Sequence, residues 1–298
     1  MIKRKIIGGA SALVVCALLA LSLEYSDAVT GAAREALTFC AVSVVPSLFF
    51  FAALARILSE VGLPPGLSRV FPLHRLVGLP ESAAPVVLCG LTGGLPVGAM
   101  LSAELYSRGQ LTKTEAARLC AVSSNVSPAF LVGVAGRLFG SIGFGIYLWA
   151  AQSIVSLLCG AFLRFLPDDG VRCTTVRTAE EKSAAAVFTS AVSSSAAACV
   201  TVTGYIVFFR VLCAIIGETA PWAVGFMSLI TEFAGGVRYA AETGSRAACA
   251  FAVGLGGISA LMQVAGYAEK AKLPLWQTVC VRAVCASVLA GGCLIFGR

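Results

Sequence analysis

Nine long apolar segments follow one another along this chain and hold few charged residues. They cover residues 6–23, 37–58, 83–106, 116–138, 141–166, 184–211, 220–240, 247–268 and 275–296. A helix that crosses a bilayer needs about 20 apolar residues. Because backbone polar groups in lipid must be hydrogen-bonded internally, segments of this length predict helices, whereas transmembrane strands would show short alternating runs. We therefore expect an all-α polytopic protein of the cell membrane.

The composition excludes several other classes of protein. Of 298 residues, 58% are hydrophobic and 12% are charged, about half the charge density of a soluble domain. The net charge of +7 comes from short loops between apolar segments, which fits membrane orientation and argues against nucleic-acid binding. The 12 cysteines are scattered without a C-x-x-C pair, so we expect no metal site, cofactor or disulfide framework. Without a P-loop, an H-E-x-x-H motif or a nucleophile–base pair, we expect no enzyme.

The N-terminus has the charge pattern of a signal peptide, with basic residues at 3–5 before an apolar run that ends at Leu23. Glu24 and Tyr25 follow, where a signal peptide would have small residues at a cleavage site. We therefore interpret the run as a retained first span with a cytoplasmic N-terminus.

The most polar stretch of the chain lies near its middle and predicts a cytoplasmic linker at residues 167–183. It separates a first half, 37–166, from a second half, 184–298. Residues 1–36 are expected to form the first span and an external loop.

Two apolar segments, 83–106 and 220–240, carry glycine or proline at their centres. These residues break helices, and broken backbone at membrane depth survives only where protein or a water-filled cavity satisfies it. If both segments re-enter without crossing, the basic loops at 107–118 and 269–274 lie on the cytoplasmic side, as the positive-inside bias requires. If all nine segments cross, both loops lie outside.

The re-entrant arrangement leaves three crossings in each half after the first span. Because three is odd, the second half is inverted relative to the first. Inverted halves with broken helices at the bilayer midplane are typical of secondary transporters.

Polar residues within apolar segments are costly and are candidates for function. Asn125 and Ser127 precede Pro128, which frees a backbone carbonyl. This cluster predicts a solute-binding break in the helix; a proline kink satisfied by a neighbouring helix is the alternative. The second candidate consists of Thr92, Gly93, Gly94 and Pro96. Its tight turn would expose backbone amides, or would serve close helix packing.

Glu232 is the most informative single residue, because no cation lies within one turn of it. It would coordinate a cation, stay protonated, or pair with Arg238. Ser259 and Gln263 are four residues apart and share a helix face, which suits a polar solute or interhelical hydrogen bonds. Arg282 is expected to extend to the interface.

Glu104, near the end of the segment 83–106, is also expected at the membrane interface.

A series of short motifs occurs along residues 37–296. They are Val45-Pro46-Ser-Leu-Phe-Phe-Phe, Gly-Gly-Leu-Pro-Val-Gly-Ala at 93–99, Glu104-Leu-Tyr-x-x-Gly109, Glu115-Ala, Asn125-x-Ser-Pro128, Thr231-Glu232, and Gly256-Gly257-x-Ser259 with Gln263.

This order resembles the YlbJ family of sporulation integral membrane proteins and the wider nucleoside-recognition, or Gate, domain group. The resemblance implies a membrane protein of spore-forming bacteria with a transport role in spore cortex formation. Ser124 stands where the family usually has a second Asn, and Leu261 and Cys285 stand where it often has His.

We therefore expect a permease-like protein for a small polar, nucleoside-like solute. The predicted midplane site comprises Thr92–Pro96, Asn125–Pro128, Glu232, Ser259 and Gln263. Expected partners are the lipid bilayer, the solute, a coupling cation at Glu232, and further copies of the chain as an oligomer. A non-transporting membrane scaffold for spore envelope assembly is the alternative, and a flippase for lipid-linked intermediates is a weaker one.

Overall fold

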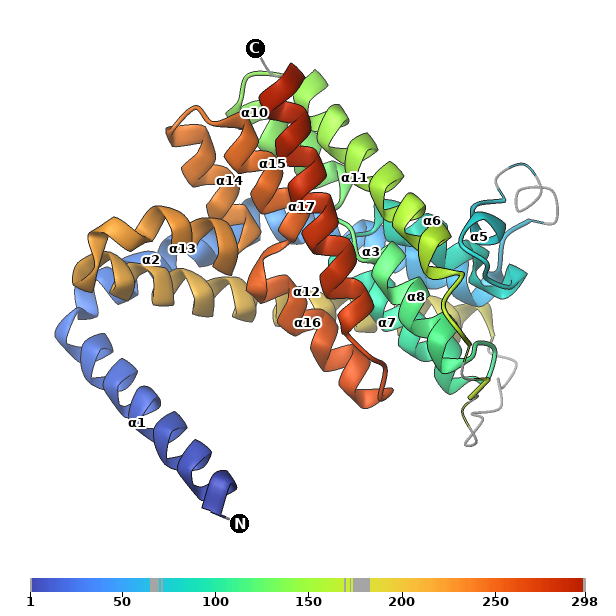
Figure 1. The fold of residues 1–298 in the computed structure, drawn as a ribbon, viewed down its shortest axis with the longest axis horizontal. Coiled ribbons are helices and arrows are strands. Elements are labelled where there is room, and N and C mark those ends of the chain that lie inside the picture. Colours follow the sequence, from blue (N-terminus) through green and yellow to red (C-terminus); the bar gives the residue numbers. More distant parts are fainter. Residues whose placement is uncertain are drawn as a thin grey trace.

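A computed structural model describes residues 2–64, 70, 72–168, 170–171, 173 and 183–296, and these residues contain helices but no strand. Six helices in this part of the chain are long and apolar enough to cross a membrane: Ser26–Val61, Lys113–Leu138, Ile142–Leu163, Ala184–Thr219, Arg246–Lys270 and Trp276–Ile295. The prediction of an all-α polytopic membrane protein is confirmed. The first predicted span corresponds to α1 (Ile2–Glu24), which projects away from the other helices (Figure 1). The linker predicted at 167–183 lies largely outside the described residues.

The first half begins with a 36-residue helix and ends with an unbroken one. Its elements are α2 (Ser26–Phe39), a π-turn (Cys40–Val44), α3 (Val45–Val61), α5 (Leu73–Leu76), a 3-10 turn (Glu81–Ala83), α6 (Ala84–Thr92), α7 (Leu95–Ser107), α8 (Lys113–Ser123), α9 (Pro128–Phe130), a second π-turn (Leu131–Ala135), α10 (Gly136–Leu138) and α11 (Ile142–Leu163).

The second half repeats this order from another 36-residue helix. Its elements are α12 (Ala184–Thr219), a 3-10 turn (Pro221–Ala223), α13 (Val224–Thr231), α14 (Phe233–Glu242), α15 (Arg246–Leu255), α16 (Gly257–Lys270) and α17 (Trp276–Phe296). In each half, a long helix precedes a pair of short helices (α6 and α7, or α13 and α14), a broken helix and an unbroken helix, and the first half has the additional short helix α5. The number of membrane crossings and the orientation of the chain remain predictions.

Residues 26–36, which we expected in an external loop, are helical and continue into the apolar span. The segment is rich in alanine, the strongest helix former, and has Asp27 in its first turn, where the helix dipole favours an acid. It packs against α12 and buries Ala36. Helix propensity and this tertiary contact outweigh the polar composition that suggested a loop.

The chain folds back on itself between α6 and α7. A β-carbon on Gly90 in α6, or on Gly98 in α7, would overlap the backbone of Ser123. Eight residues along one continuous helix span about 12 Å, so both arms can contact the same residue only if the chain turns between them. The turn lies at Gly94, whose φ of +97° suits glycine.

The chain also folds back between α13 and α14. A β-carbon on Gly236 would lie 3.0 Å from the carbonyl oxygen of Ser228 and 3.1 Å from the Cα of Leu229. The arms of the two hairpins contain eight to 13 residues, fewer than the roughly 20 that a crossing needs. The helix breaks lie where the sequence predicts them in segments 83–106 and 220–240; re-entry of the two hairpins into the membrane stays a prediction.

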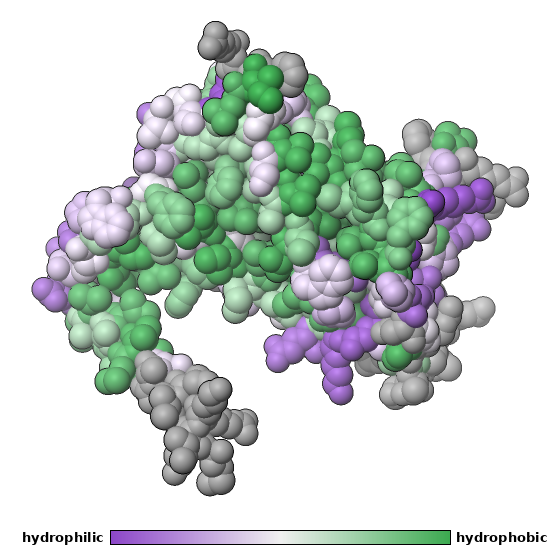
Figure 2. Space-filling view, in the orientation of Figure 1, coloured by the Kyte–Doolittle hydropathy of each residue, from purple (hydrophilic) through white to green (hydrophobic). Residues whose placement is uncertain are grey.

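Two further helices are interrupted near their middle. The helix that begins with α8 is unwound at residues 124–127 and restarts at Pro128. Between α15 and α16 the chain passes through Gly256, whose φ is +77°. Around these breaks, Figure 2 shows a largely apolar surface over α11 and α17, with Ile154, Leu158 and Val288 exposed.

Replacing Gly98 by alanine is expected to destabilise the protein by about 1–3 kcal/mol, because the new β-carbon would overlap the backbone of Ser123. Gly204→Ala in α12 is the matched control, since a β-carbon there meets nothing within 4 Å. Thermal unfolding of both purified variants in detergent would measure the difference. Equal melting temperatures for the two variants would contradict the close approach of α7 to α8.

Candidate functional site

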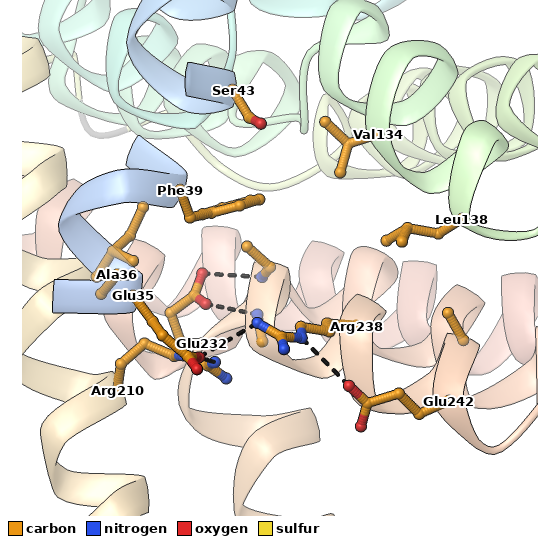
Figure 3. Close-up of a pocket in the computed structure, with 14 residues that line it drawn as sticks. Glu35, Ala36, Phe39, Ser43, Val134, Leu138, Arg210, Glu232, Arg238 and Glu242 are labelled. Carbon is orange, nitrogen blue, oxygen red and sulfur yellow. Dashed lines mark hydrogen bonds and ion pairs between the residues drawn. The ribbon is translucent and has the colours of Figure 1, made fainter. Parts of the chain in front are cut away.

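A cavity of about 560 Å³ lies between α2, α12, α14 and the helix that follows Pro128. Its lining residues are Glu35, Ala36, Phe39, Ser43, Val134, Leu138, Ile206, Arg210, Glu232, Ala234, Gly235, Arg238, Ala241 and Glu242. Figure 3 shows charged side chains along one wall, with Phe39, Val134 and Leu138 across from them. The volume falls within the range of small-molecule sites, roughly 300–1,000 Å³.

Glu232 occupies the tip of the second hairpin and caps the N-terminus of α14. One carboxylate oxygen accepts a hydrogen bond from the amide of Ala234 at 2.8 Å, and the other accepts one from Gly235 at 2.6 Å. The side chain is 1% exposed but lines the cavity (Figure 3). A carboxylate is favourable here because the helix dipole is positive at this end.

Arg238, which the sequence offered as an ion-pair partner for Glu232, bonds to other carboxylates. Its guanidinium lies 3.3 Å from Glu35 and 3.2 Å from Glu242, and Arg210 lies 3.6 Å from Glu35. We call Glu35, Arg210, Arg238 and Glu242 the cavity network. The side chains of Glu35, Arg238 and Glu242 are more than half exposed, so they mark the mouth of the cavity.

A second ionic network joins the end of α3 to the end of α7. Arg56 bonds to Glu104, and Arg108 lies 2.5 Å from Glu104 and 2.7 Å from Glu60. We call these four residues the closed network, because their side chains are only 13–22% exposed. Glu104 was expected at the interface; its partner Arg108 is four residues away at the end of the same helix, whereas Arg56 is 48 residues away and could not be inferred from a local pattern.

The two networks lie toward opposite ends of one helix. Glu35 and Arg56 belong to the continuous helix Ser26–Val61 and are separated by 21 residues. At the rise of an α-helix this corresponds to about 32 Å, close to the thickness of the hydrocarbon core. Each network contains two arginines and two glutamates, and each includes the end of a hairpin helix.

Side chains of α11 form hydrogen bonds with polar groups of the unwound segment 124–127. The amide group of Gln152 donates to the Val126 carbonyl at 2.6 Å and accepts from the Val126 N–H at 3.2 Å. Asn125 donates to the Val122 carbonyl at 2.7 Å, and its oxygen accepts from the Ser156 hydroxyl at 2.7 Å. Asn125, Gln152 and Ser156 are all fully buried.

Arg282 is also fully buried, which corrects the expectation that it would extend to the interface. Its guanidinium donates to the carbonyl of Ser124 at 3.1 Å, to the oxygen of Asn125 at 3.3 Å and to the carbonyl of Val253 at 2.5 Å. The sequence position of Arg282 near the start of an apolar segment gave no sign of these acceptors. They become available because α17 packs against both α8 and α15.

The remaining predicted residues of the first half lie around the hairpin tip and the break. The hydroxyl of Thr92 donates to the Leu88 carbonyl at 3.1 Å, and Pro96 is buried in the first turn of α7. Ser127 caps the helix that starts at Pro128, accepting from the amide of Phe130 at 3.3 Å. A β-carbon on Gly94 would lie 3.8 Å from that of Ser127, so the tip and the break adjoin.

In the second half, the tip of the hairpin also adjoins the break in the neighbouring helix. A β-carbon on Gly257 would lie 3.1 Å from the Cα of Glu232, and the rings of Phe130 and Phe233 meet edge to face at 5.0 Å. Gln263 donates to Ser259 at 3.4 Å, so these two residues share a helix face. Of the predicted site residues, only Glu232 lines the cavity. Among the described residues no group of three His, Cys, Asp or Glu side chains could hold a metal ion.

Comparison with known proteins supports part of the resemblance. The chain is 26% identical over 219 residues to the sporulation integral membrane protein YlbJ of Bacillus subtilis (strain 168). The match covers 65% of this chain and 53% of that protein, so the chain spans about half the length of this relative. No family model matches the chain, and no solved structure matches it. The chain is a multi-pass integral membrane protein that is similar to YlbJ, and the assignment to the Gate domain group stays a prediction.

Proposed function

We propose that this chain is a sporulation-associated permease that moves a small polar solute across the membrane by alternating access. The observation that carries the proposal is the pair of ionic networks at opposite ends of one span. One network is compact and mostly buried, whereas the other borders a cavity of about 560 Å³. Such an arrangement is what a transporter needs when it is closed on one side and open on the other.

The cavity suits a solute of the size of a nucleoside that carries both hydrogen-bonding groups and an apolar surface. Its wall offers two guanidinium groups and three carboxylates, while Phe39 and Val134 supply apolar contact. Each carboxylate oxygen of Glu232 retains acceptor capacity beyond its one amide partner. Glu232 is therefore the residue that would attract a coupling cation or an amino group of the solute.

The hairpins supply the moving parts of this mechanism. The closed network ties α7 of the first hairpin to α3, and the cavity network includes Arg238 and Glu242 on α14 of the second. Opening the closed side requires the ion pairs of Glu104 to separate. Closing the cavity requires the second hairpin to move inward, and the ion pair between Arg238 and Glu35 already joins α14 to α2 at the mouth. Movement of inverted halves around a fixed central site is the established principle of such folds.

The scaffold alternative also has an observation in its favour. The polar groups at 124–127 are satisfied within the protein by Gln152, Ser156 and Arg282, as a rigid structural element would require. In a scaffold, however, the charges that line the cavity should be dispensable. The two functions are therefore separated by substitutions in the cavity.

Glu232→Gln and Arg210→Gln are expected to lower the yield of heat-resistant spores at least tenfold in a spore former that depends on this chain. Each change removes a charge from the cavity wall. Glu218→Gln, an exposed carboxylate on α12 outside both networks, is the control. All variants are compared at equal membrane abundance and after measurement of their melting temperatures. Wild-type spore yield from both cavity variants would favour the scaffold.

Binding of the transported solute is expected to raise the melting temperature of the purified protein, because a ligand at 100 times its Kd adds about 2.7 kcal/mol to stability. Nucleosides, divalent cations and cell-wall precursors are the compounds to screen. Ala241→Phe, which fills part of the cavity, should abolish the shift. A shift that persists in Ala241→Phe would place the binding site elsewhere.

Glu104→Gln is expected to increase hydrogen–deuterium exchange at the end of α7, since it weakens both ion pairs made by that carboxylate. Glu242→Gln is the corresponding change in the cavity network, and its carboxylate is 63% exposed. It should leave exchange in α7 unchanged. If Glu104→Gln also leaves exchange unchanged, the closed network does not hold this side of the protein shut.

A further inference from the structure

We propose that the guanidinium of Arg282 is a built-in cation, which permanently fills a cation site formed by the C-terminal ends of the broken helices α8 and α15. This inference goes beyond the permease mechanism, and it holds whether or not a solute is moved. It rests on the position of the charge, the oxygen atoms around it and the lack of a carboxylate partner.

The guanidinium lies where two helices end. The helix α8 ends at Ser123 and α15 ends at Leu255, and the carbonyl groups in the last turn of a helix have no partner within it. Arg282 donates to the carbonyls of Ser124 and Val253, one from each helix end. The dipole of each helix places about half a negative charge at its C-terminus, so two such ends together offset about one positive charge.

The oxygen atoms around Arg282 are those that a bound cation would have. The carbonyls of Ser124 and Val253 and the amide oxygen of Asn125 all lie within 3.3 Å of its terminal nitrogens. In transporters built from inverted repeats, unwound carbonyls and half-helix C-terminal ends coordinate the coupling ion. In this chain the same kind of acceptor set is occupied by a side chain that cannot dissociate.

Arg282 has no carboxylate partner that would explain its burial in another way. Within the part of the chain that the structure describes, it forms no ion pair, and its Nε has no hydrogen-bond partner. The buried carboxylate of Glu232 is bonded to the amides of α14. A buried charge is tolerated only when it is compensated, and here the helix ends supply the compensation.

The site also joins parts of the protein from both halves. Arg282 belongs to α17, Val253 lies in α15, and Ser124 lies at the break in the first half. Because the cation is tethered to α17, the contact between the halves does not depend on the ion concentration on either side of the membrane. A free coupling cation would have to bind elsewhere, for which the carboxylate of Glu232 in the cavity wall is the candidate named above.

Thermal unfolding of Arg282→Lys and Arg282→Met in purified full-length protein tests the need for a positive charge. The two side chains are of similar length, so the lysine variant should melt several degrees above the methionine variant. A methionine variant that melts at the same temperature as the lysine variant, or higher, would overturn the proposal. Apolar replacements of buried ions are often neutral or stabilising when no cation is needed.

Chemical rescue tests the site itself. In Arg282→Ala, millimolar guanidinium chloride should raise the melting temperature by several degrees relative to equal concentrations of choline chloride. Wild type and Arg137→Ala, which removes an exposed arginine, should show no rise. A folded Arg282→Ala protein that guanidinium does not stabilise would also overturn the proposal.

Discussion

The structure depends on keeping every backbone polar group hydrogen-bonded where the membrane helices are broken. Four residues, 124–127, are unwound near the middle of a span, where no lipid group can replace the lost helical bonds. The side-chain amide of Gln152 bonds to both the N–H and the carbonyl of Val126, and Arg282 donates a hydrogen bond to the carbonyl of Ser124. The break is therefore a defined structure that three helices build together.

Close approach of backbones makes these side-chain bonds possible. Gly90 and Gly98 allow both arms of the first hairpin to contact Ser123, and Gly254 allows α15 to lie against the backbone of Ala286 in α17. The contact between α15 and α17 brings the Val253 carbonyl within reach of Arg282. Small residues thus set the helix distances, as they commonly do in membranes where burial of apolar surface gives little driving force.

Two kinds of polar structure with different roles result from this packing. The centre around Arg282 and Asn125 is fully buried and internally bonded, which suits a fixed axis. The ionic networks at the ends of the hairpins are more exposed, and they differ from one another in compactness. A fixed centre between two adjustable ends is the physical basis of the proposed alternating access.

The sequence by itself determined the helical membrane class and the positions of the breaks, because segment length, glycine and proline act locally on the backbone. It also singled out Glu232, but only the structure shows that its carboxylate caps α14 by accepting from the amides of Ala234 and Gly235. Only the tertiary structure decided the burial of Arg282 and the membership of the two ionic networks. The pairs Arg238–Glu242 and Glu104–Arg108 are four residues apart and are local. Arg282, however, is 158 residues from Ser124, and Arg238 is 203 residues from Glu35, so these contacts are set by helix packing and leave no local pattern in the sequence.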